Sequence, residues 1–271
     1  MDFKQIISIH GVPRSGTTWL GQILDSSPQV KYKYQPLFSY TFKNKINLQS
    51  TQTDILNFYQ QLYNKSDEFL DQIKQKETGI HPTFKDKTNS PLWLVTKMVR
   101  YHYLVPHLLK NIENIKFVFI VRNPCGSLKS WKNAPREFKK DLWDFNEQWE
   151  FGQCRNEFRP EEYFGYHKWK EAAKLFLDMK DKYPERVFLL KYEDLVKDPL
   201  GKSMELYKFC DLDFSDQTKE FIKDSTNIKQ EDVYSVYKGP KDVNDWKNEL
   251  DESIVNKIYN DLKDTELGIF L

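Results

Sequence analysis

The segment HGVPRSGTTWL, residues 10–20, combines glycines, hydroxyl side chains and an arginine in a pattern suited to holding a phosphate. It follows a short apolar run and opens a stretch with helical spacing. Backbone N–H groups and the positive end of a helix dipole therefore converge there. Arg14 adds a full positive charge within the loop. The alternative is a glycine turn with a solvent-exposed arginine, and the strand–helix setting disfavours it.

The spacing of Gly11 and Gly16 matches a nucleotide-triphosphatase loop, but two further features of such enzymes are missing. Thr17 stands where that loop has its lysine. The neighbouring strand of such enzymes also carries a metal-holding acid, whereas the apolar run KFVFIV here leads into Arg122. We therefore expect the loop to hold a phosphate-bearing anion without magnesium, and we expect no metal site.

Four apolar runs predict the strands that position this loop. They are rich in β-branched and aromatic residues and alternate with helical patterns, and they cover residues 3–9, 93–97, 116–121 and 187–191. Such alternation predicts an α/β fold with a mostly parallel sheet covered by helices on both faces. Ligands collect at the carboxyl ends of strands in these sheets, and Lys97 ends the second run.

The remaining regions contain no repeat and no low-complexity linker, so we expect residues 1–271 to form a single domain. Two regions are interpreted as insertions at the rim of the sheet: the polar residues 41–90, with one helical stretch near 54–75, and the aromatic-rich residues 136–170, most of whose aromatic side chains are interpreted as core. The C-terminal residues 201–264 are interpreted as helices with a break near 225–250.

The bulk composition limits the kinds of partner and the cellular compartment that we expect. The chain has 41 basic and 40 acidic residues, so it lacks the basic excess of a protein that coats nucleic acid. Its three cysteines show no CxxC spacing, which fits a reducing compartment. We find neither a signal peptide nor an apolar stretch long enough to cross a membrane. We expect a cytoplasmic protein without nucleic-acid or membrane partners, as a monomer or homodimer.

The sequence resembles the PAPS-dependent sulfotransferases in this loop, and the resemblance extends over most of the chain. PAPS is 3′-phosphoadenosine 5′-phosphosulfate. The form PRSGTT is closest to the tyrosylprotein and carbohydrate branch. The resemblance implies a P-loop-NTPase-like fold, PAPS as donor and adenosine 3′,5′-bisphosphate as product. It implies that Arg14 contacts the sulfate, and that the other loop contacts to the nucleotide come from Ser15, Gly16, Thr17, Thr18 and Trp19.

Two further segments extend the resemblance. In VRNPCGSLKSW, Arg122 and Ser130 match the family's arginine and serine, eight residues apart, that bind the 3′-phosphate. An arginine at a strand end and a serine two turns into the next helix can meet on one phosphate. VYKGPKDVNDWKNEL resembles the cytosolic branch's closing loop, which implies that Lys238 and Gly239 contact the 3′-phosphate, although Tyr237 replaces its arginine. The segment 189–199 is interpreted as structural, and its Tyr192 as a further nucleotide contact.

The transfer chemistry requires cations where negative charge builds, and a base for the acceptor's proton. Arg14 and then Lys97 are our candidates for the cations. Where related enzymes place a glutamate, about twenty residues after the loop arginine, this sequence has Gln35, which cannot act as a base. His102 is the candidate base among five histidines. The alternative is an acceptor that needs little help, such as a nitrogen or an acidic hydroxyl.

The resulting hypothesis is a sulfotransferase of the EC 2.8.2 type that acts on a small-molecule acceptor, such as a natural product or a sugar. The sequence does not name the acceptor or decide between oxygen and nitrogen. A metabolite or nucleotide kinase is the second hypothesis, disfavoured by Thr17. A catalytically inactive nucleotide-binding protein of the same fold is the third, and Gln35 keeps it open.

Overall fold

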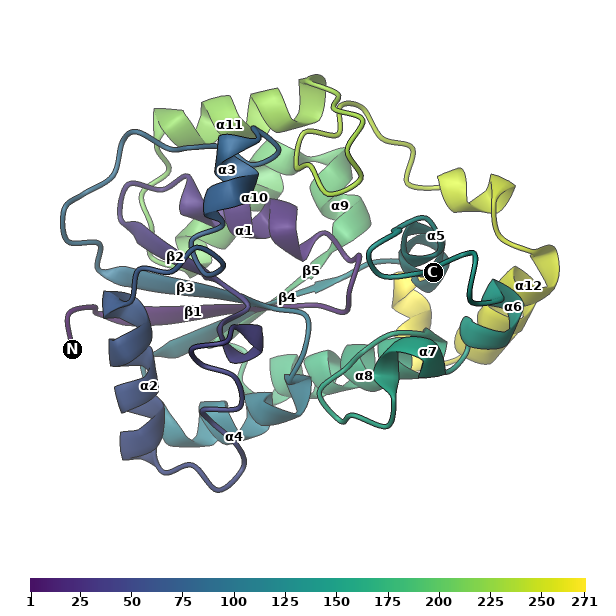
Figure 1. Cartoon of the computed structure of the whole chain (residues 1–271), viewed down its shortest axis with the longest axis horizontal. Helices are drawn as coiled ribbons and strands as arrows, with labels where there is room; N and C mark the ends of the chain where they lie inside the picture. The colour runs from purple at the N-terminus through teal and green to yellow at the C-terminus, as the bar shows by residue number, and fades with distance from the viewer.

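A five-stranded, entirely parallel sheet runs through the centre of the computed structural model, which describes residues 1–271 (Figure 1). Its order is β2-β3-β1-β4-β5. The strands are β1 (Gln5–His10), β2 (Val30–Tyr34), β3 (Trp93–Met98), β4 (Ile115–Val121) and β5 (Val187–Lys191). The predicted α/β fold and its parallel sheet are confirmed, and four of the five strands lie where the apolar runs predicted them.

The order of the strands creates a crevice between β1 and β4. The chain leaves β1 toward β2 and β3 on one side, and it leaves β4 toward β5 on the other. Where neighbouring parallel strands lead in opposite directions, the loops at their carboxyl ends separate and leave room for a ligand. The loop that contains Arg14 follows β1, and Arg122 follows β4. Both predicted anion-binding segments therefore border this crevice.

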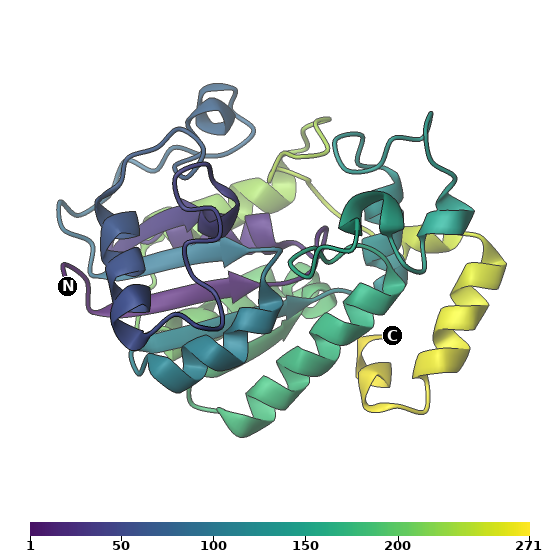
Figure 2. The same ribbon diagram turned by 60° about the horizontal axis from the view of Figure 1, so that its bottom comes forward.

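Helices cover both faces of the sheet (Figures 1 and 2). A core of 22 buried residues lies between the sheet and α1 (Thr17–Asp25), α9 (Tyr192–Lys197), α10 (Pro199–Phe209) and α11 (Asp216–Asn227). The opposite core has 46 buried residues and lies against α2 (Gln52–Asn64), α4 (Val105–Asn111) and α8 (Tyr166–Lys182). None of these helices is both long and apolar enough to span a bilayer.

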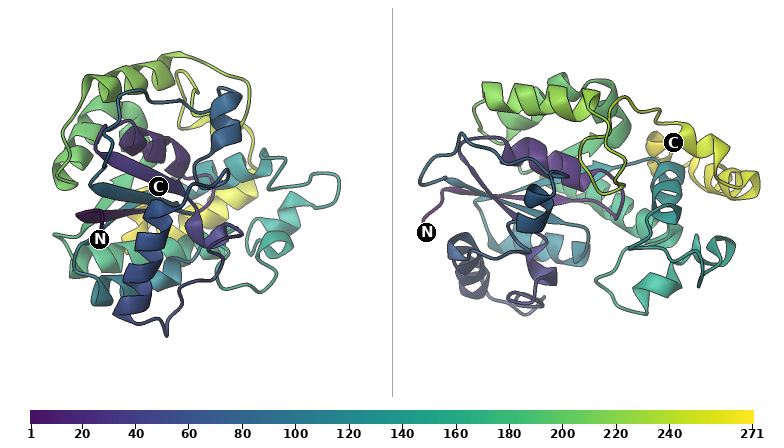
Figure 3. Two further views of the ribbon diagram at one scale, coloured as in Figure 1. Left: turned by 60° about the vertical axis from the view of Figure 1, so that its left-hand side comes forward. Right: turned by 45° about the horizontal axis from the view of Figure 1, so that its top comes forward.

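A second group of helices lies beyond the carboxyl ends of the strands (Figure 2). It consists of α5 (Pro124–Lys132), α6 (Phe145–Gln148), α7 (Gln153–Asn156) and α12 (Glu252–Leu262). Residues 228–244 connect α11 to this group and pass beside the amino end of α1 (Figure 3). The other elements are the short helix α3 (Ile73–Glu77) and the 3-10 turns Pro36–Phe38, His102–Leu104, Asp245–Asn248 and Glu266–Phe270.

Two regions differ from their predictions. The edge strand β2 was not predicted, because its sequence VKYKY alternates with lysines; Lys33 is nevertheless buried, since its ammonium pairs with Asp71 at 2.6 Å. The predicted helix near 54–75 ends at Asn64, and its apolar side belongs to the central core rather than to a rim insertion. Within residues 136–170, the large aromatic side chains are mostly buried, as the sequence predicted.

Candidate active site

A cavity of about 400 Å³ opens at the carboxyl ends of β1, β3 and β4. Most of the residues predicted from the sequence line it: Arg14, Gly16, Thr17, Thr18, Trp19, Lys97, Arg122, Ser130, Tyr192 and Lys238. Three predicted residues do not line it: Ser15, His102 and Gly239. Segments far apart in the sequence thus meet at one place, as expected for an open parallel sheet.

The loop after β1 presents backbone donors to the cavity. Gly16 has a φ of 88° and is the N-cap of α1, which has no side-chain cap. A β-carbon on Gly16 would lie 2.6 Å from the ring of Tyr192, so only glycine fits here. The backbone N–H groups of Gly16, Thr17 and Thr18 donate to no atom of the protein. The buried hydroxyl of Ser15 also has no partner, so the loop has several unused donors.

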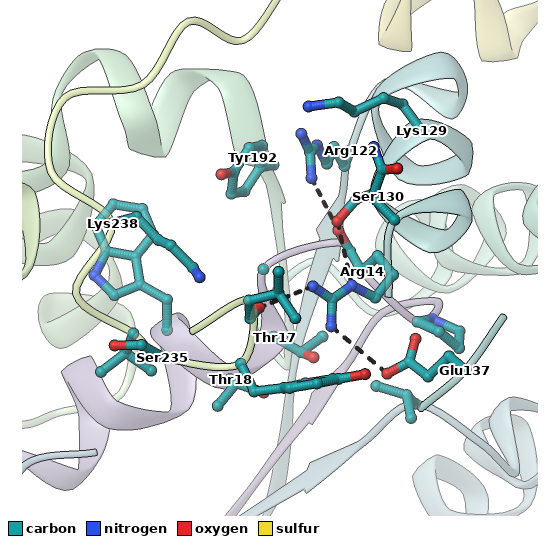
Figure 4. A pocket seen from close by; sticks show the side chains of 18 of the residues that line it. Arg14, Thr17, Thr18, Arg122, Lys129, Ser130, Glu137, Tyr192, Ser235 and Lys238 are labelled. Carbon is teal, nitrogen blue, oxygen red and sulfur yellow. Dashed lines mark hydrogen bonds and ion pairs between the residues drawn. The ribbon is translucent and has the colours of Figure 1, made fainter. Parts of the chain in front are cut away.

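Arg14 crosses the middle of the cavity (Figure 4). Its Nε donates to the hydroxyl of Ser130 at 3.2 Å, and its Nη2 donates to the carbonyl of Val233 at 3.1 Å. Its Nη1 lies 3.6 Å from a carboxylate oxygen of Glu137. The side chain is only 17% exposed. The guanidinium is thus fixed between three segments, with one of its edges toward a carboxylate.

Arg122 lies at the other side of the same crevice. Its Nη1 donates to the carbonyl of Arg14 at 3.2 Å, and its guanidinium lies 4.6 Å from the centre of the Tyr192 ring. Its Nε is buried without a partner. A side chain on Gly126 would collide with this group, since a β-carbon there would be 2.9 Å from Nε. Ser130 faces the cavity from α5, one turn after Gly126.

Trp19 and two lysines form a third wall. The indole N–H of Trp19 donates to the hydroxyl of Ser225 at 2.9 Å, which fixes the plane of the ring. Lys241 donates to the hydroxyl of Tyr192 at 2.7 Å and lies over both rings. Burial, with the charges of Lys241 and Arg14, lowers the pKa of Lys238 to about 8. These ammonium groups therefore crowd one another around a flat aromatic surface.

Four cations of the cavity have only neutral partners. Lys97 faces the ring of Tyr34, and the other three donate to uncharged oxygens: Arg122 to the carbonyl of Arg14, Lys238 to the carbonyl of Asp232 and Lys241 to the hydroxyl of Tyr192. Because buried charges are costly unless they are paired, such a cluster favours the binding of an anion. No group of three or more His, Cys, Asp and Glu side chains is arranged to hold a metal ion.

Lys97 is the most strongly affected of these cations. It is 3% exposed, at the carboxyl end of β3. Burial lowers its pKa to about 7, and Arg100 and Arg14 add to the decrease while the carboxylate of Glu137 opposes it. Near neutral pH the side chain is therefore only partly charged. An anion placed beside it would raise its pKa and restore the full charge.

Replacing Lys97 with methionine is expected to increase the free energy of unfolding by about 2–4 kcal/mol below pH 7, since one pKa unit corresponds to about 1.4 kcal/mol. The ordinary pKa of 10.5 in the unfolded chain exceeds the folded value of about 7. The unfolded chain therefore holds more protons between these values, and stability of the native protein rises with pH across this interval. The advantage of the variant should be lost near pH 10. Denaturant unfolding at pH 6, 8 and 10 measures it.

Lys33→Met is the matched control, because Lys33 is equally buried but is paired with Asp71 at 2.6 Å. That variant leaves a carboxylate without its partner, so we expect it to be less stable than the native protein. If Lys97→Met lowered stability at pH 6 as Lys33→Met does, the buried charge of Lys97 would not destabilise the native protein as predicted.

Gln35 lines the cavity and is held by Arg100. Its side-chain oxygen accepts from Arg100 Nη1 at 2.9 Å, and Arg100 Nε donates to Glu162 at 2.8 Å. The backbone N–H of Gln35 donates to the carbonyl of Lys97, with a left-handed φ of 41°. The amide is therefore rigidly placed and can orient a ligand, but it cannot take up a proton.

The structure does not support His102 as a base. The side chain is completely buried, and its Nδ1 lies 2.9 Å from Nδ1 of His10, which in turn contacts Ser8. Burial, reinforced by the neighbouring His10, holds the pKa of His102 well below its usual value. The reason is a turn that the sequence did not predict: Tyr101 adopts a φ of 60°, and the 3-10 turn that follows carries His102 into the core.

Arg100, Glu137 and Lys241 are among the side chains of the cavity that were not predicted from the sequence. Arg100 follows Lys97 by three residues, so its position just after the end of a strand could have identified it as a site residue. Lys241 follows the Lys238-Gly239 pair by two residues. Glu137 had no signal, because the lysine-rich residues 129–140 resemble a solvated surface.

The arrangement suits the binding of an elongated molecule with more than one anionic group. One group can meet the free N–H groups of the loop, and another can meet Arg122 and Ser130. Arg14 follows β1, which lies between β4, the strand before Arg122, and β3, the strand that carries Lys97. A group transferred past Arg14 would move from one part of the cavity to the other.

Comparisons with known proteins identify a matching family model, a related protein and solved structures of similar fold. A model described as "Sulfotransferase family" matches residues 7–216. A Caenorhabditis briggsae protein named "Putative protein-tyrosine sulfotransferase" is 24% identical over 222 residues, which cover 80% of this chain and 69% of that protein. Mouse sulfotransferase SULT7A1 complexed with PAP is 14% identical, with a TM-score of 0.56 over 98% of this chain and 87% of that one. Retinol dehydratase with androsterone and "inactive cofactor PAP" is also 14% identical, with a TM-score of 0.56 over 97% and 82%.

Proposed function

The chain belongs to the sulfotransferase family, and we propose that it transfers a sulfuryl group from PAPS to a hydroxyl or nitrogen of a small molecule. Adenosine 3′,5′-bisphosphate is the second product. The observation that carries this proposal is the group of four cations without carboxylate partners around a loop with free N–H groups. The fold is that of neighbours crystallised with PAP.

The proposal assigns the two ends of the donor to different segments. The 5′-phosphate binds the loop donors of Ser15, Gly16, Thr17 and Thr18. The 3′-phosphate binds Arg122 and Ser130. Lys238 and Gly239 contact it from the closing segment, residues 236–250. The adenine lies against Trp19, whose ring is fixed by Ser225. Support comes from the orphaned Ser15 hydroxyl and Arg122 Nε, both buried donors in need of an acceptor.

The chemistry follows from the charges beside the transferred group. As the bond between sulfur and the bridging oxygen breaks, negative charge builds on the leaving phosphate, and Arg14 stabilises it. Lys97, charged once an anion is near, stabilises the sulfuryl oxygens. Both cations are already fixed before the reaction, so little reorganisation is needed. No metal ion is required in this scheme, because the arginine and lysine supply the positive charge.

The acceptor is expected in the part of the cavity on the β3 side of Arg14. Tyr34, Val99 and Phe164 give it apolar walls, and Gln35 and Arg100 give it polar contacts. A small natural product or sugar-like molecule suits this lining, and we propose a cytoplasmic enzyme, monomeric or homodimeric. The name of the Caenorhabditis briggsae relative makes a tyrosine phenol the second acceptor to examine.

Adenosine 3′,5′-bisphosphate at 100 times its dissociation constant is expected to stabilise the protein by about 2.7 kcal/mol, which raises Tm by about 5–10 °C. AMP at the same concentration should give a far smaller increase, because it lacks the phosphate that meets Arg122 and Ser130. Thermal unfolding with either ligand, and with Mg-ATP, measures the difference. A larger shift with Mg-ATP would support a kinase. Bisphosphate binding without turnover of PAPS across an acceptor panel would support an inactive binding protein.

A further inference from the structure

We propose that Glu137 accepts the proton of the acceptor and thereby replaces the missing glutamate at position 35. This inference rests on the proposed sulfuryl transfer and identifies its base. It was not predicted from the sequence, because Glu137 follows α5 in a stretch that resembles a charged surface. The structure instead brings its carboxylate into the cavity, 3.6 Å from Arg14 Nη1.

The charges around Arg14 divide the cavity into two parts, and Glu137 belongs to the second. On the side of Trp19 and Tyr192, the charges of Lys241 and Arg14 lower the pKa of Lys238. On the other side, the pKa of Lys97 responds to Glu137, Arg100 and Arg14 together. Figure 4 shows the carboxylate of Glu137 facing Arg14 from the side opposite Lys238. The carboxylate therefore lies across Arg14 from the nucleotide, where an acceptor would enter.

The other carboxylates of the cavity are poorly suited to the task. Asp245 is paired with Lys129 at 2.8 Å, and Asp242 is exposed on the closing segment, where it caps Asn244. Glu162, behind Gln35, does not line the cavity and is occupied by Arg100. No histidine lines the cavity. Glu137 is thus the carboxylate that lies beside Arg14 and faces the proposed acceptor side of the cavity.

Lys97 is the competing candidate, because its lowered pKa provides a neutral amine near pH 7. A sulfate group placed beside it reverses that condition, since a nearby anion favours the ammonium form. Lys97 is then a cation during the transfer and holds no free electron pair. The same anion also pairs with Arg14, and this weakens the attraction between Arg14 and Glu137. The carboxylate of Glu137 is then free to accept a hydrogen bond from the acceptor.

Glu137 is held in place by contacts on both sides of its position in the chain. The indole of Trp131 donates to its carbonyl at 3.3 Å, and the backbone N–H of Arg136 donates to the hydroxyl of Tyr234 at 2.8 Å. One oxygen of its carboxylate, Oε2, is buried without a partner. The charged and titratable side chains that face it are Arg14, Tyr34, Lys97 and Tyr234.

The transfer forms one bond to sulfur and breaks another. The acceptor oxygen forms a bond to sulfur with its lone pair, and the bond from sulfur to the bridging oxygen breaks. The electron pair of that bond leaves with the 5′-phosphate of adenosine 3′,5′-bisphosphate. The acceptor proton passes to the carboxylate of Glu137 and is later released to water. General bases of this kind contribute about 10²–10⁴-fold to rates.

Acceptors of different acidity test the assignment, with phenol and 4-nitrophenol as probes and PAPS as donor. Glu137→Gln is expected to lower kcat about 10²-fold with phenol. With 4-nitrophenol, which ionises near neutral pH and needs no base, the loss should be below about fivefold. Release of bisphosphate without a phenol reports transfer to water and should fall as it does with phenol. The dissociation constant of the bisphosphate should change less than about threefold, because Glu137 lies away from its phosphates.

Glu249→Gln is the matched control, since Glu249 is also paired with a cation, Lys129 at 2.9 Å, but does not line the cavity. It should retain full activity with both phenols. Equal losses with phenol and 4-nitrophenol in Glu137→Gln would overturn the role as a base, and so would unchanged activity with phenol and water. Failure of the native protein to bind the bisphosphate or to consume PAPS would instead remove the proposed function itself.

Discussion

Arg14→Ala is expected to reduce sulfuryl transfer by about 10³-fold or more, by analogy with arginines that stabilise phosphoryl transfer. The residue crosses the cavity, and its guanidinium has donors toward Ser130, Val233 and Glu137. The sulfate of a bound donor would replace one or more of these contacts of Arg14. Alanine removes the positive charge from the position where the bridging oxygen gains negative charge, so the loss should appear in kcat. Initial rates of bisphosphate release from PAPS measure it.

The fold should survive this change. The contacts of Arg14 are two hydrogen bonds and a long ion pair of 3.6 Å with Glu137. Glu137 still has the charge of Lys97 nearby when Arg14 is removed, so its carboxylate is not left without a cation. We therefore expect a small change in Tm. Arg136→Ala is the matched control. The guanidinium of Arg136 lies 4.4 Å from the centre of the Tyr234 ring, which Arg14 also approaches at 5.4 Å, but Arg136 lies outside the cavity. Arg14→Lys should recover only part of the rate, since an ammonium lacks the planar fork. Retention of native activity by Arg14→Ala would refute the mechanism.

The elements that the sequence predicts correctly are those specified by local pattern. The loop after β1 and the Arg122–Ser130 pair each lie at a junction of strand and helix, where an apolar run, a glycine or proline and the helical period determine the path of the chain. Both line the cavity, and their contacts with a phosphate stay a prediction. The strand β2 has no such pattern, because two of its five residues are lysines, and the burial of Lys33 depends on Asp71, 38 residues away.

The residues that the sequence could not place depend on contacts between distant segments. Glu137 enters the cavity because Arg136 is tied to Tyr234, nearly a hundred residues further along. Arg100 is fixed by Glu162 and Gln35, from two other segments. His102 was expected near the site by its distance from β3, but one left-handed residue at Tyr101 directs it into the core. Local spacing predicts how far a residue is from a strand end and does not predict toward which side it turns.

The second large effect is expected from Arg122→Ala, which should weaken binding of adenosine 3′,5′-bisphosphate about 10²-fold, since hydrogen bonds to charged groups contribute about 1.5–3 kcal/mol each. Affinity for AMP should change less than about threefold, because AMP has no phosphate to meet this arginine. The specificity of the change follows from the structure: Arg122 Nε is buried without a partner, and Nη1 has only the carbonyl of Arg14. Titration calorimetry with both nucleotides gives the two ratios.

Lys129→Ala distinguishes a placed arginine from positive charge in general. Lys129 lies on the same helix as Ser130 and also borders the cavity, but its charge is neutralised by Asp245 at 2.8 Å and Glu249 at 2.9 Å. Its removal should therefore change bisphosphate affinity by no more than about threefold. If Lys129→Ala weakened the bisphosphate as much as Arg122→Ala, or if Arg122→Ala weakened AMP equally, the 3′-phosphate would bind through the general field of the cavity. A selective loss in Arg122→Ala alone would place that phosphate against one guanidinium at the carboxyl end of β4, beside the crevice that the strand order creates.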